Sequence, residues 1–432
     1  MTYRLTMRDA QGQDSFLLYN AHTNSLTDES GVPVAMDYQP EKPWRHAVAI
    51  SPDEPGLKVA TPTRIKIQLG LKCNYSCSYC LQSAEIPDAS ASSMADVEAF
   101  LANLDTWLKS APERIEFWGG EPFVYWAHLK RLVPAMREKF PNAQFVTVSN
   151  GSLLDDEKID FIDRYDIRMG ISHDAMGQHL RGPDPMDEPG RVEIFQRLID
   201  RRPHGAITFN AVLTAGNCDV DAITEWIQKR LDRKVPVTFE GVVHSYDQEN
   251  KGDVAKWGAE QYSQLQFNVV KAMVQGTEAG YYSTIGQKAV RFLDSLKARR
   301  PAAAISQKCG MDTPNNLAVD LKGNVTTCQN VGAAGKHGIG HVSDIPGVRL
   351  TSSWHWSKRE TCNSCPVLQL CQGACMYNEG DDFAQSCENE FHFNSAIMAG
   401  ALYWLTGKML VHVEGDIRRP KKRKVIPIAL AG

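Results

Sequence analysis

Three closely spaced cysteines are the residues of this chain best suited to do chemistry. Cys73, Cys77 and Cys80 follow directly on the apolar stretch from Ile65 to Leu71. Three thiolates can hold three irons of a four-iron cluster and leave the fourth iron open, whereas clusters bound by four thiolates mostly transfer electrons. An open iron can chelate a small molecule through an amine and a carboxylate. Taken alone, the triplet is also compatible with a zinc knuckle or with buried thiols.

A second group of cysteines lies in the C-terminal third of the chain. Thirteen residues separate Cys309 from Gly323, and four more separate Gly323 from Cys328. The remaining members are Cys362, Cys365, Cys371, Cys375 and Cys387. Pairs spaced Cys-x2-Cys also occur in tetrathiolate zinc sites, so these cysteines alone favour zinc and iron–sulfur equally. Together with the N-terminal triplet they favour iron–sulfur clusters, and Cys218 is left as a spectator.

Between the two cysteine groups, apolar runs of strand length alternate with stretches of helical periodicity. The expected strands are Arg64 to Gly70, Arg114 to Trp118, Gln144 to Ser149, Arg168 to Ser172, Ala206 to Leu213 and Val235 to Val242. The expected helices are Ser93 to Lys109, Trp126 to Lys139, Asp155 to Tyr165, Arg191 to Arg202 and Asp219 to Leu231. This order predicts an α/β fold, a parallel partial barrel with outer helices and with functional residues at the C-terminal ends of its strands.

Polar and glycine-rich segments follow the next three strands. Trp118-Gly119-Gly120-Glu121 ends the second strand, and its two glycines allow the backbone to approach a ligand closely. We expect Gly120→Val to lower the affinity for that ligand rather than to disturb folding. Ser149-Asn150-Gly151 ends the third strand and Ser172-His173-Asp174-Ala175 the fourth. Each segment is also compatible with an ordinary turn.

These motifs together resemble the radical S-adenosylmethionine (radical SAM) enzymes, and the C-terminal cysteines resemble the seven-cysteine SPASM extension found in a subset of them. The resemblance implies a partial (β/α)6 radical SAM barrel followed by a cysteine-rich SPASM domain with auxiliary iron–sulfur clusters. It implies S-adenosyl-L-methionine (SAM) and three [4Fe-4S] clusters as cofactors. The implied cluster ligands are Cys73, Cys77 and Cys80; Cys309, Cys328 and Cys375; and Cys362, Cys365, Cys371 and Cys387.

The same resemblance assigns cofactor contacts to residues at the strand ends. They are Tyr79 near the adenine, Gly119, Gly120 and Glu121 near the methionine amine, Ser149 in the next turn, Ser172 at the carboxylate or ribose, and Asn210 and Leu213 beside the ribose and adenine. A downstream arginine is expected to join Ser172, because a guanidinium binds a carboxylate through two parallel hydrogen bonds. Arg181 and Arg191 are both candidates, and we favour Arg191.

Two positions differ from the anaerobic sulfatase-maturating members of this family. In those enzymes an Asp that serves as the base follows the cysteine matched by Cys328. Here Gln329 follows, and a carboxamide cannot accept a proton at neutral pH. A further family cysteine, a few residues before Cys309, is replaced within Ala302 to Ala304. The first auxiliary cluster is therefore expected to have three thiolate ligands and one iron open to water, another ligand or substrate.

The resemblance to SPASM enzymes implies an oxidoreductase that reductively cleaves SAM and removes hydrogen from a ribosomal precursor peptide. The product would be a thioether, carbon–carbon or carbon–oxygen crosslink. The first alternative is a formylglycine-generating, sulfatase-maturating enzyme with a relocated base, and the second is a non-radical iron–sulfur or metal-binding module. The expected partners are the peptide, an electron donor such as flavodoxin or ferredoxin, and a separate leader-binding protein. The insert from Val243 to Arg300, rich in aromatic and polar residues, would provide room for a peptide channel.

Composition limits the remaining possibilities. The chain has 432 residues, of which 43% are hydrophobic and 23% charged, enough for more than one domain of ~100 to 200 residues. Its net charge of -4 argues against a nucleic-acid partner. The apolar segment Ser395 to Leu405 is shorter than the ~20 residues of a membrane span, so we expect no membrane partner and read the segment as a buried helix. The N-terminus has no apolar signal segment, so we expect reduced thiols and a cytoplasmic location.

Four regions are expected along the chain. They are an N-terminal extension with short strands (1–60), the barrel (61–300), the SPASM domain (301–395), and a C-terminal helix with a basic tail (396–432). Tyr3 to Met7 and Ser15 to Tyr19 are the expected strands of the extension. The extension is too short for a winged-helix leader-binding domain, and the basic run from Arg418 to Lys424 is expected to be a solvated tail.

Overall fold

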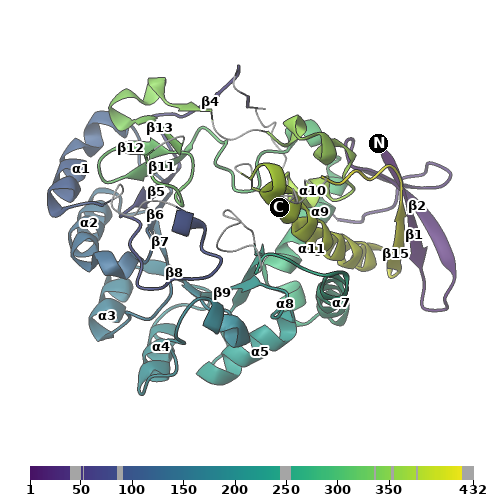
Figure 1. The fold of residues 1–432 in the computed structure, drawn as a ribbon, viewed down its shortest axis with the longest axis horizontal. Helices are drawn as coiled ribbons and strands as arrows, with labels where there is room; N and C mark the ends of the chain where they lie inside the picture. The colour runs from purple at the N-terminus through teal and green to yellow at the C-terminus, as the bar shows by residue number, and fades with distance from the viewer. Residues whose placement is uncertain are drawn as a thin grey trace, which may run out of the picture.

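The computed structural model describes residues 1–38, 50–51, 53–84, 91–243, 254–334, 337–351, 355–375 and 378–420. Its centre is a sheet in which six parallel strands follow one another in chain order, with helices on the outer face (Figure 1). The strands are β5 (Arg64–Gln68), β6 (Arg114–Trp118), β7 (Gln144–Ser149), β8 (Ile167–Ser172), β9 (Ile207–Leu213) and β10 (Val237–Val242). The helices are α1 (Met94–Trp107), α2 (Trp126–Lys139), α3 (Asp156–Arg164), α4 (Arg191–Asp200) and α5 (Val220–Leu231). The predicted partial barrel is confirmed, with each element within a few residues of its expected bounds.

The two faces of each barrel strand differ because successive side chains in a strand point to opposite sides. In β9 every second residue from Ile207 to Leu213 is buried, and the residues between them are half-buried. The buried set packs under the helices, while the half-buried set, which includes Asn210, faces the interior of the barrel. The following helix begins where the Asp219 side chain accepts hydrogen bonds from the N–H groups of Asp221 and Ala222. Such a cap satisfies backbone donors that a helix leaves without partners.

The C-terminal domain extends the barrel sheet on the β5 side. Strand β11 (Asn316–Asp320) pairs in parallel with β5, and β12 (Asn324–Thr326) and β13 (Gly338–His341) follow in antiparallel order. The sequence did not predict these strands. Cys309 precedes β11 and Cys328 follows β12, so these two cysteines flank a strand pair that lies beside β5. Strand β5 in turn leads to Cys73.

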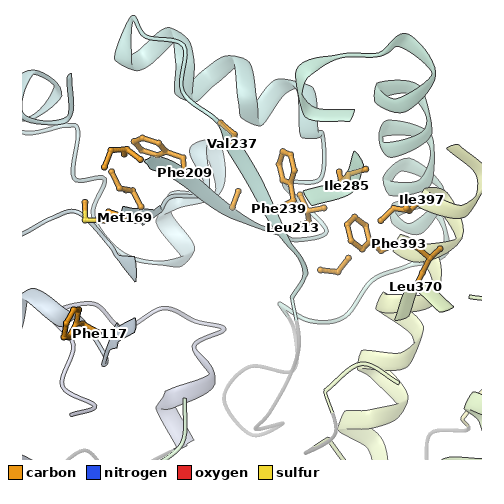
Figure 2. Packing of buried hydrophobic residues seen from close by; sticks show 14 of the residues in the cluster. Phe117, Met169, Phe209, Leu213, Val237, Phe239, Ile285, Leu370, Phe393 and Ile397 are labelled. Atoms are coloured by element: carbon orange, nitrogen blue, oxygen red, sulfur yellow. The ribbon is translucent and has the colours of Figure 1, made fainter. Parts of the chain in front are cut away.

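The insert after β10 forms helices that pack against a long C-terminal helix. These are α7 (Ala259–Gln275), α8 (Glu278–Tyr281), α9 (Thr284–Lys297) and α11 (Gly380–Thr406). Figure 2 shows the apolar core running from Phe239 of β10 through Ile285 of α9 to Phe393 of α11. Barrel and C-terminal domain therefore share one core. The insert supplies this core in place of the expected channel wall.

Helix α11 corrects one expected element and one expected boundary. The apolar pattern predicted a helix only from Ser395, but α11 begins at Gly380, so the boundary between residues 395 and 396 falls inside it. The first half is polar and still buried: Asn389 and Glu390 are 0% exposed. Asn389 Nδ2 donates to the carbonyls of Val243 and Ala255 at 2.9 and 3.0 Å. An apolar pattern cannot predict a buried helix face that is satisfied by hydrogen bonds.

The two ends of the chain form a separate antiparallel sheet in the order β15-β1-β2-β3 (Figure 1). It comprises β1 (Thr2–Arg8), β2 (Asp14–Asn20), β3 (Ser25–Asp28) and β15 (Met409–Glu414). The first two strands were expected, whereas the pairing of β1 with β15 was not. Within the described ranges, no helix combines the length and apolar character needed to cross a membrane.

Candidate active site and cluster sites

The loop that carries Cys73, Cys77 and Cys80 lies over the C-terminal ends of the barrel strands and is held from three sides. From the β6 side, the N–H groups of Gly120 and Glu121 donate to the carbonyls of Gly70 and Lys72, both at 3.0 Å. From the β7 side, Asn150 Nδ2 donates to Asn74 Oδ1 at 2.9 Å. These contacts fix the loop before any cofactor is considered.

The same loop is tied to the segment after β8. The N–H of Ser78 donates to the Leu180 carbonyl at 2.8 Å, and the Tyr75 hydroxyl donates to the Pro183 carbonyl at 2.7 Å. Loops of three successive strands therefore meet at the cysteine triplet. This convergence is the arrangement that the sequence predicted for the strand ends.

The three thiols of the loop lie near enough to one another to interact electrostatically. Burial raises the pKa of Cys77 to about 11, and the neighbouring Cys73 and Cys80 contribute to the rise, while Arg181 opposes it. A thiol binds metal as the thiolate. Because burial disfavours the thiolate here, a positive partner such as a metal is needed to stabilise it. The donor set therefore fits an iron–sulfur cluster with three cysteine ligands.

Gly119 and Gly120 are packed against the cysteine loop itself. A Cβ atom on Gly120 would lie 2.3 Å from the Lys72 carbonyl oxygen, and one on Gly119 would lie 2.8 Å from the Gly70 oxygen. The expectation that a side chain here would intrude only on a ligand is wrong: it would first displace the backbone next to Cys73. The glycines are needed because two protein segments approach each other.

Glu121 is turned away from the interior of the barrel. Its carboxylate is 1% exposed and accepts hydrogen bonds from Ser149 Oγ at 2.8 Å, Asn150 N at 2.8 Å and Phe123 N at 3.0 Å. Burial raises its pKa to about 6, although these hydrogen bonds oppose the rise. The side chains of Glu121 and Ser149, both expected at the cofactor, therefore join the ends of β6 and β7 to each other.

Tyr79, expected near the adenine, belongs to a buried polar group. Its hydroxyl donates to Asp174 Oδ2 through a short hydrogen bond. Asp174 also pairs with Arg181, whose Nη2 lies 3.0 Å from Asp174 Oδ1, and accepts from Val212 N at 2.9 Å. The sequence did not single out Asp174 for this role, because its position after a strand is equally typical of a turn.

Arg181 and Arg191, the two arginine candidates, occupy different environments. Arg191 donates to the carbonyls of Gly151 and Ser152 at 2.7 and 2.9 Å, and also to those of Leu154 and Pro185. Its guanidinium is therefore committed to shaping the turn after β7. The Arg181 guanidinium instead lies 5.4 Å from the centre of the Tyr79 ring in the cysteine loop.

Ser172 and Asn210 are the two expected contacts that face the barrel interior. They are register partners on β8 and β9, and Thr238 Oγ1 of β10 donates to Asn210 Oδ1 at 2.7 Å. Leu213 lies three residues after Asn210, so it points to the opposite face, where it is fully buried beside Phe239 (Figure 2). Only the Asn210 side chain of the two therefore faces the barrel interior, and the expected cofactor contacts of both residues stay a prediction. Val212 takes the interior position.

The expected first auxiliary group consists of Cys309, Cys328 and Cys375. Burial raises the pKa of Cys328 to about 12, and Cys309 and Cys375 both contribute to the rise. The three thiols thus lie close together. The segment that carries the additional cysteine in related enzymes is the short helix Ala302–Ala304.

The residues after Cys328 enter the barrel. Gln68 Nε2 donates to the carbonyls of Gln329 and Val331 at 2.8 and 2.9 Å, and Trp118 Nε1 donates to Asn330 Oδ1 at 2.8 Å. Lys66 Nζ lies 3.2 Å from Gln329 Oε1. The interior faces of β5 and β6 therefore hold the first auxiliary group at the mouth of the barrel.

The second auxiliary group lines a small recess that is partly open to solvent. Cys362, Cys365, Cys371 and Cys387 all contribute to its wall. Burial raises the pKa of both Cys362 and Cys365 to about 12, whereas Arg419 donates to Cys387 Sγ at 3.4 Å. Four thiols around one space, with a cation beside them, fit a cluster with four cysteine ligands. Among the described residues, no three Cys, His, Asp or Glu side chains converge on a position for a single metal ion.

Comparisons with known proteins agree with this geometry. Residues 67–201 match the radical SAM superfamily. The chain is 25% identical over 173 residues to an S-adenosylmethionine-dependent nucleotide dehydratase of Oncorhynchus mykiss, covering 38% of this chain and 47% of that one. It is 27% identical over 161 residues to an uncharacterized protein of Methanocaldococcus jannaschii, covering 36% and 54%. The chain thus spans about half the length of these curated relatives.

One group of solved structures shares most of the fold. The anaerobic sulfatase-maturating enzyme anSMEcpe, solved with bound AdoMet and the Cp18Cys peptide, superposes with a TM-score of 0.57 at 17% identity and covers 80% of this chain and 99% of its own. The same enzyme with AdoMet alone gives a TM-score of 0.54 at 16% identity. The overlap extends well beyond residues 67–201. Residues 67–201 of this chain thus match the radical SAM superfamily, and the chain shares the fold of the radical SAM/SPASM-type enzyme anSMEcpe.

Proposed function

We propose that this protein reductively cleaves SAM and uses the resulting radical to remove hydrogen from a peptide, in which a crosslink then forms. Cys73, Cys77 and Cys80 would hold the cluster that binds SAM, and the two C-terminal groups would hold auxiliary clusters. When bound, the cluster and SAM supply a carbon-centred radical at the barrel mouth. The protein positions and shields that chemistry.

The observation that carries the proposal is the link between the first auxiliary group and the barrel interior. Cys328 is followed directly by residues that bond to Gln68 and Trp118, whose strands end at the SAM-cluster loop. A substrate bound at the strand ends would therefore lie between the two sites. It could lose a hydrogen atom on one side and an electron on the other.

A proton must also leave the substrate when such a bond forms, and Gln329 cannot accept it. Glu240 is the carboxylate that we propose for this step. It is the extra residue of a bulge in β10, since Phe239 pairs with Ala211 and Gly241 with Val212. Bulges redirect side chains near active sites. The Glu240 side chain is exposed, and desolvation by the surrounding protein raises its pKa, with Arg181 and Lys308 opposing the rise.

The test of SAM cleavage uses reconstituted enzyme, dithionite and SAM, with 5′-deoxyadenosine as the readout. Replacing Cys73, Cys77 and Cys80 together by Ala should abolish its formation and leave the spectra of the auxiliary clusters unchanged. Replacing Cys218, which is buried against Asn268, is the matched control and should change neither. Zinc with little sulfide in the reconstituted protein would exclude the proposed chemistry.

The sulfatase-maturating activity is the second candidate, because anSMEcpe shares the fold and was solved with a cysteine peptide. Incubation with a sulfatase-derived peptide, followed by mass spectrometry, separates the two. We expect no formylglycine, because Gln329 replaces the base. Formylglycine formed at the rate of SAM cleavage would favour the second candidate, and its loss in Glu240→Gln would then identify Glu240 as the relocated base.

A further inference from the structure

Arg181 makes contacts that differ from those implied by the family resemblance. An arginine after β8 was expected to bind the cofactor carboxylate. Instead its Nη2 lies 3.0 Å from Asp174 Oδ1 and its Nε lies 3.0 Å from Asp174 Oδ2. Arg181 is 9% exposed and Asp174 only 1%. Two buried charges of opposite sign depend on each other, because removing one leaves the other without compensation.

Asp174 connects this ion pair to two further segments. It accepts a hydrogen bond from Val212 N of β9 at 2.9 Å, and its Oδ2 accepts from the Tyr79 hydroxyl. Asn217 Nδ2 donates to the Asp174 carbonyl at 2.7 Å and so fixes its backbone. One carboxylate therefore joins the end of β9, the segment after β8 and the cysteine loop.

The Arg181 segment touches consecutive residues of the cysteine loop. The Leu180 carbonyl accepts from Ser78 N at 2.8 Å and from Ser78 Oγ at 3.2 Å. The Arg181 guanidinium lies 5.4 Å from the centre of the Tyr79 ring, within the range of a cation–π contact. Cys77 precedes these two residues, so the Arg181 segment contacts the loop directly beside a proposed cluster ligand.

We propose that Tyr79, Asp174 and Arg181 hold the loop segment from Cys77 to Cys80 in position. We further propose that the Arg181 charge makes the bound cluster easier to reduce. The three are then positioning residues rather than cofactor ligands. Asp174 offsets part of the Arg181 charge, and removing that charge would leave a buried carboxylate without compensation. The lost cation and the uncovered anion both disfavour an added electron, more strongly in a buried site than in water. The inference rests on the proposed cluster at Cys73, Cys77 and Cys80, and it does not depend on the proposed peptide substrate.

The test compares Arg181→Gln, Arg181→Lys and Tyr79→Phe in the reconstituted full-length enzyme. The readouts are the midpoint potential of the cluster whose electron paramagnetic resonance (EPR) signal changes on adding SAM, the shape of that signal, and SAM affinity. Arg233→Gln is the matched control, because Arg233 forms a similar two-bond pair with Asp200, at 2.7 and 2.9 Å, on the exposed surface. A merely structural role of Arg181 would leave the midpoint potential unchanged.

Arg181→Gln should shift the one-electron reduction equilibrium at least tenfold toward the oxidised cluster, which corresponds to about 59 mV. Arg181→Lys should restore the potential, since the charge remains. Tyr79→Phe should keep the potential and alter the EPR signal, because one tie of the loop is lost. Arg233→Gln should match the wild type throughout.

An unchanged potential and signal in Arg181→Gln would overturn the inference while leaving SAM cleavage in the wild type intact. Loss of SAM affinity at an unchanged potential in Arg181→Lys would also overturn it and identify Arg181 as a cofactor ligand. If Arg181→Gln does not fold, Tyr79→Phe and Arg181→Lys decide by the same two readouts. A wild type without any SAM-responsive signal would instead remove the proposed function, and the inference with it.

Discussion

Substitution of Gly120 tests whether the second strand end serves the cofactor or the cluster loop. In Gly120→Ala the new Cβ would lie 2.3 Å from the Lys72 carbonyl oxygen and 2.6 Å from the Leu71 oxygen. Both contacts are with backbone atoms, so the loop must move by several tenths of an ångström. Lys72 precedes Cys73, and the displacement therefore reaches the first cluster ligand.

The expected cost has two parts. Overpacking of this kind typically destabilises a protein by about 1 to 3 kcal/mol. A misplacement approaching 1 Å in a catalytic group lowers the rate on the order of 100-fold. Gly119→Ala should have a smaller effect, because its Cβ would lie 2.8 Å from the Gly70 oxygen. Gly216→Ala is the control, since a Cβ there meets nothing within 4 Å and the backbone is not left-handed.

The assay measures iron content, SAM affinity and 5′-deoxyadenosine formation in the same samples. We expect cluster retention and SAM affinity to fall together, most in Gly120→Ala and less in Gly119→Ala. Both quantities should stay at the wild-type level in Gly216→Ala. A Gly120→Ala enzyme that keeps its full iron content and loses only SAM affinity would refute this reasoning. It would show that the glycine leaves room for the ligand alone.

Three further substitutions test the fold and the site. Phe393→Ala, at a side chain 1% exposed, should destabilise the protein by about 3 to 5 kcal/mol in urea unfolding, whereas Phe267→Ala, at 60% exposed, should have little effect. Burial raises the pKa of Glu121 from 4.5 to about 6, so the stability contributed by its proton is complete below pH 4.5 and is lost as pH rises through 6. Relative to Glu121→Gln, the wild type should lose about 2 kcal/mol of unfolding free energy across this window, and a constant difference would contradict the assignment. Trp118→Phe removes the hydrogen bond to Asn330 and should alter the EPR signal of the first auxiliary cluster while SAM binding persists; an unchanged signal would show that this contact does not hold the auxiliary loop.

The barrel was predictable because its strands and helices follow simple periodic patterns. Strands β6 and β7 and helix α2 begin and end at the expected residues. Elements that depend on distant partners were not predictable in this way. Strand β11 forms because β5 offers an edge, and β15 forms because β1 does.

In the candidate site, too, features set by the local sequence pattern could be predicted, whereas individual side-chain contacts could not. The division of the cysteines into three groups comes from their spacing and the family resemblance, and it stays a prediction. The individual contacts of Glu121 and Leu213 were missed because the direction of a side chain depends on strand alternation near the last residues, where a shift of one position reverses the face. Glu240 was missed because a bulge interrupts that alternation and the sequence gives no signal for it.

The pairing of β1 with β15 has a consequence for how the protein is made. About 400 residues separate the two strands along the chain, from Arg4 to its partner Glu414. Synthesis proceeds from the N-terminus, so the first strand leaves the ribosome long before its partner exists. Until then β1 can pair with β2 along one edge only. The edge of β1 that later pairs with β15 exposes unpaired backbone groups to any neighbouring chain. The small sheet thus closes only after β15 has been made, and we expect removal of β15 to increase the aggregation of newly made chains.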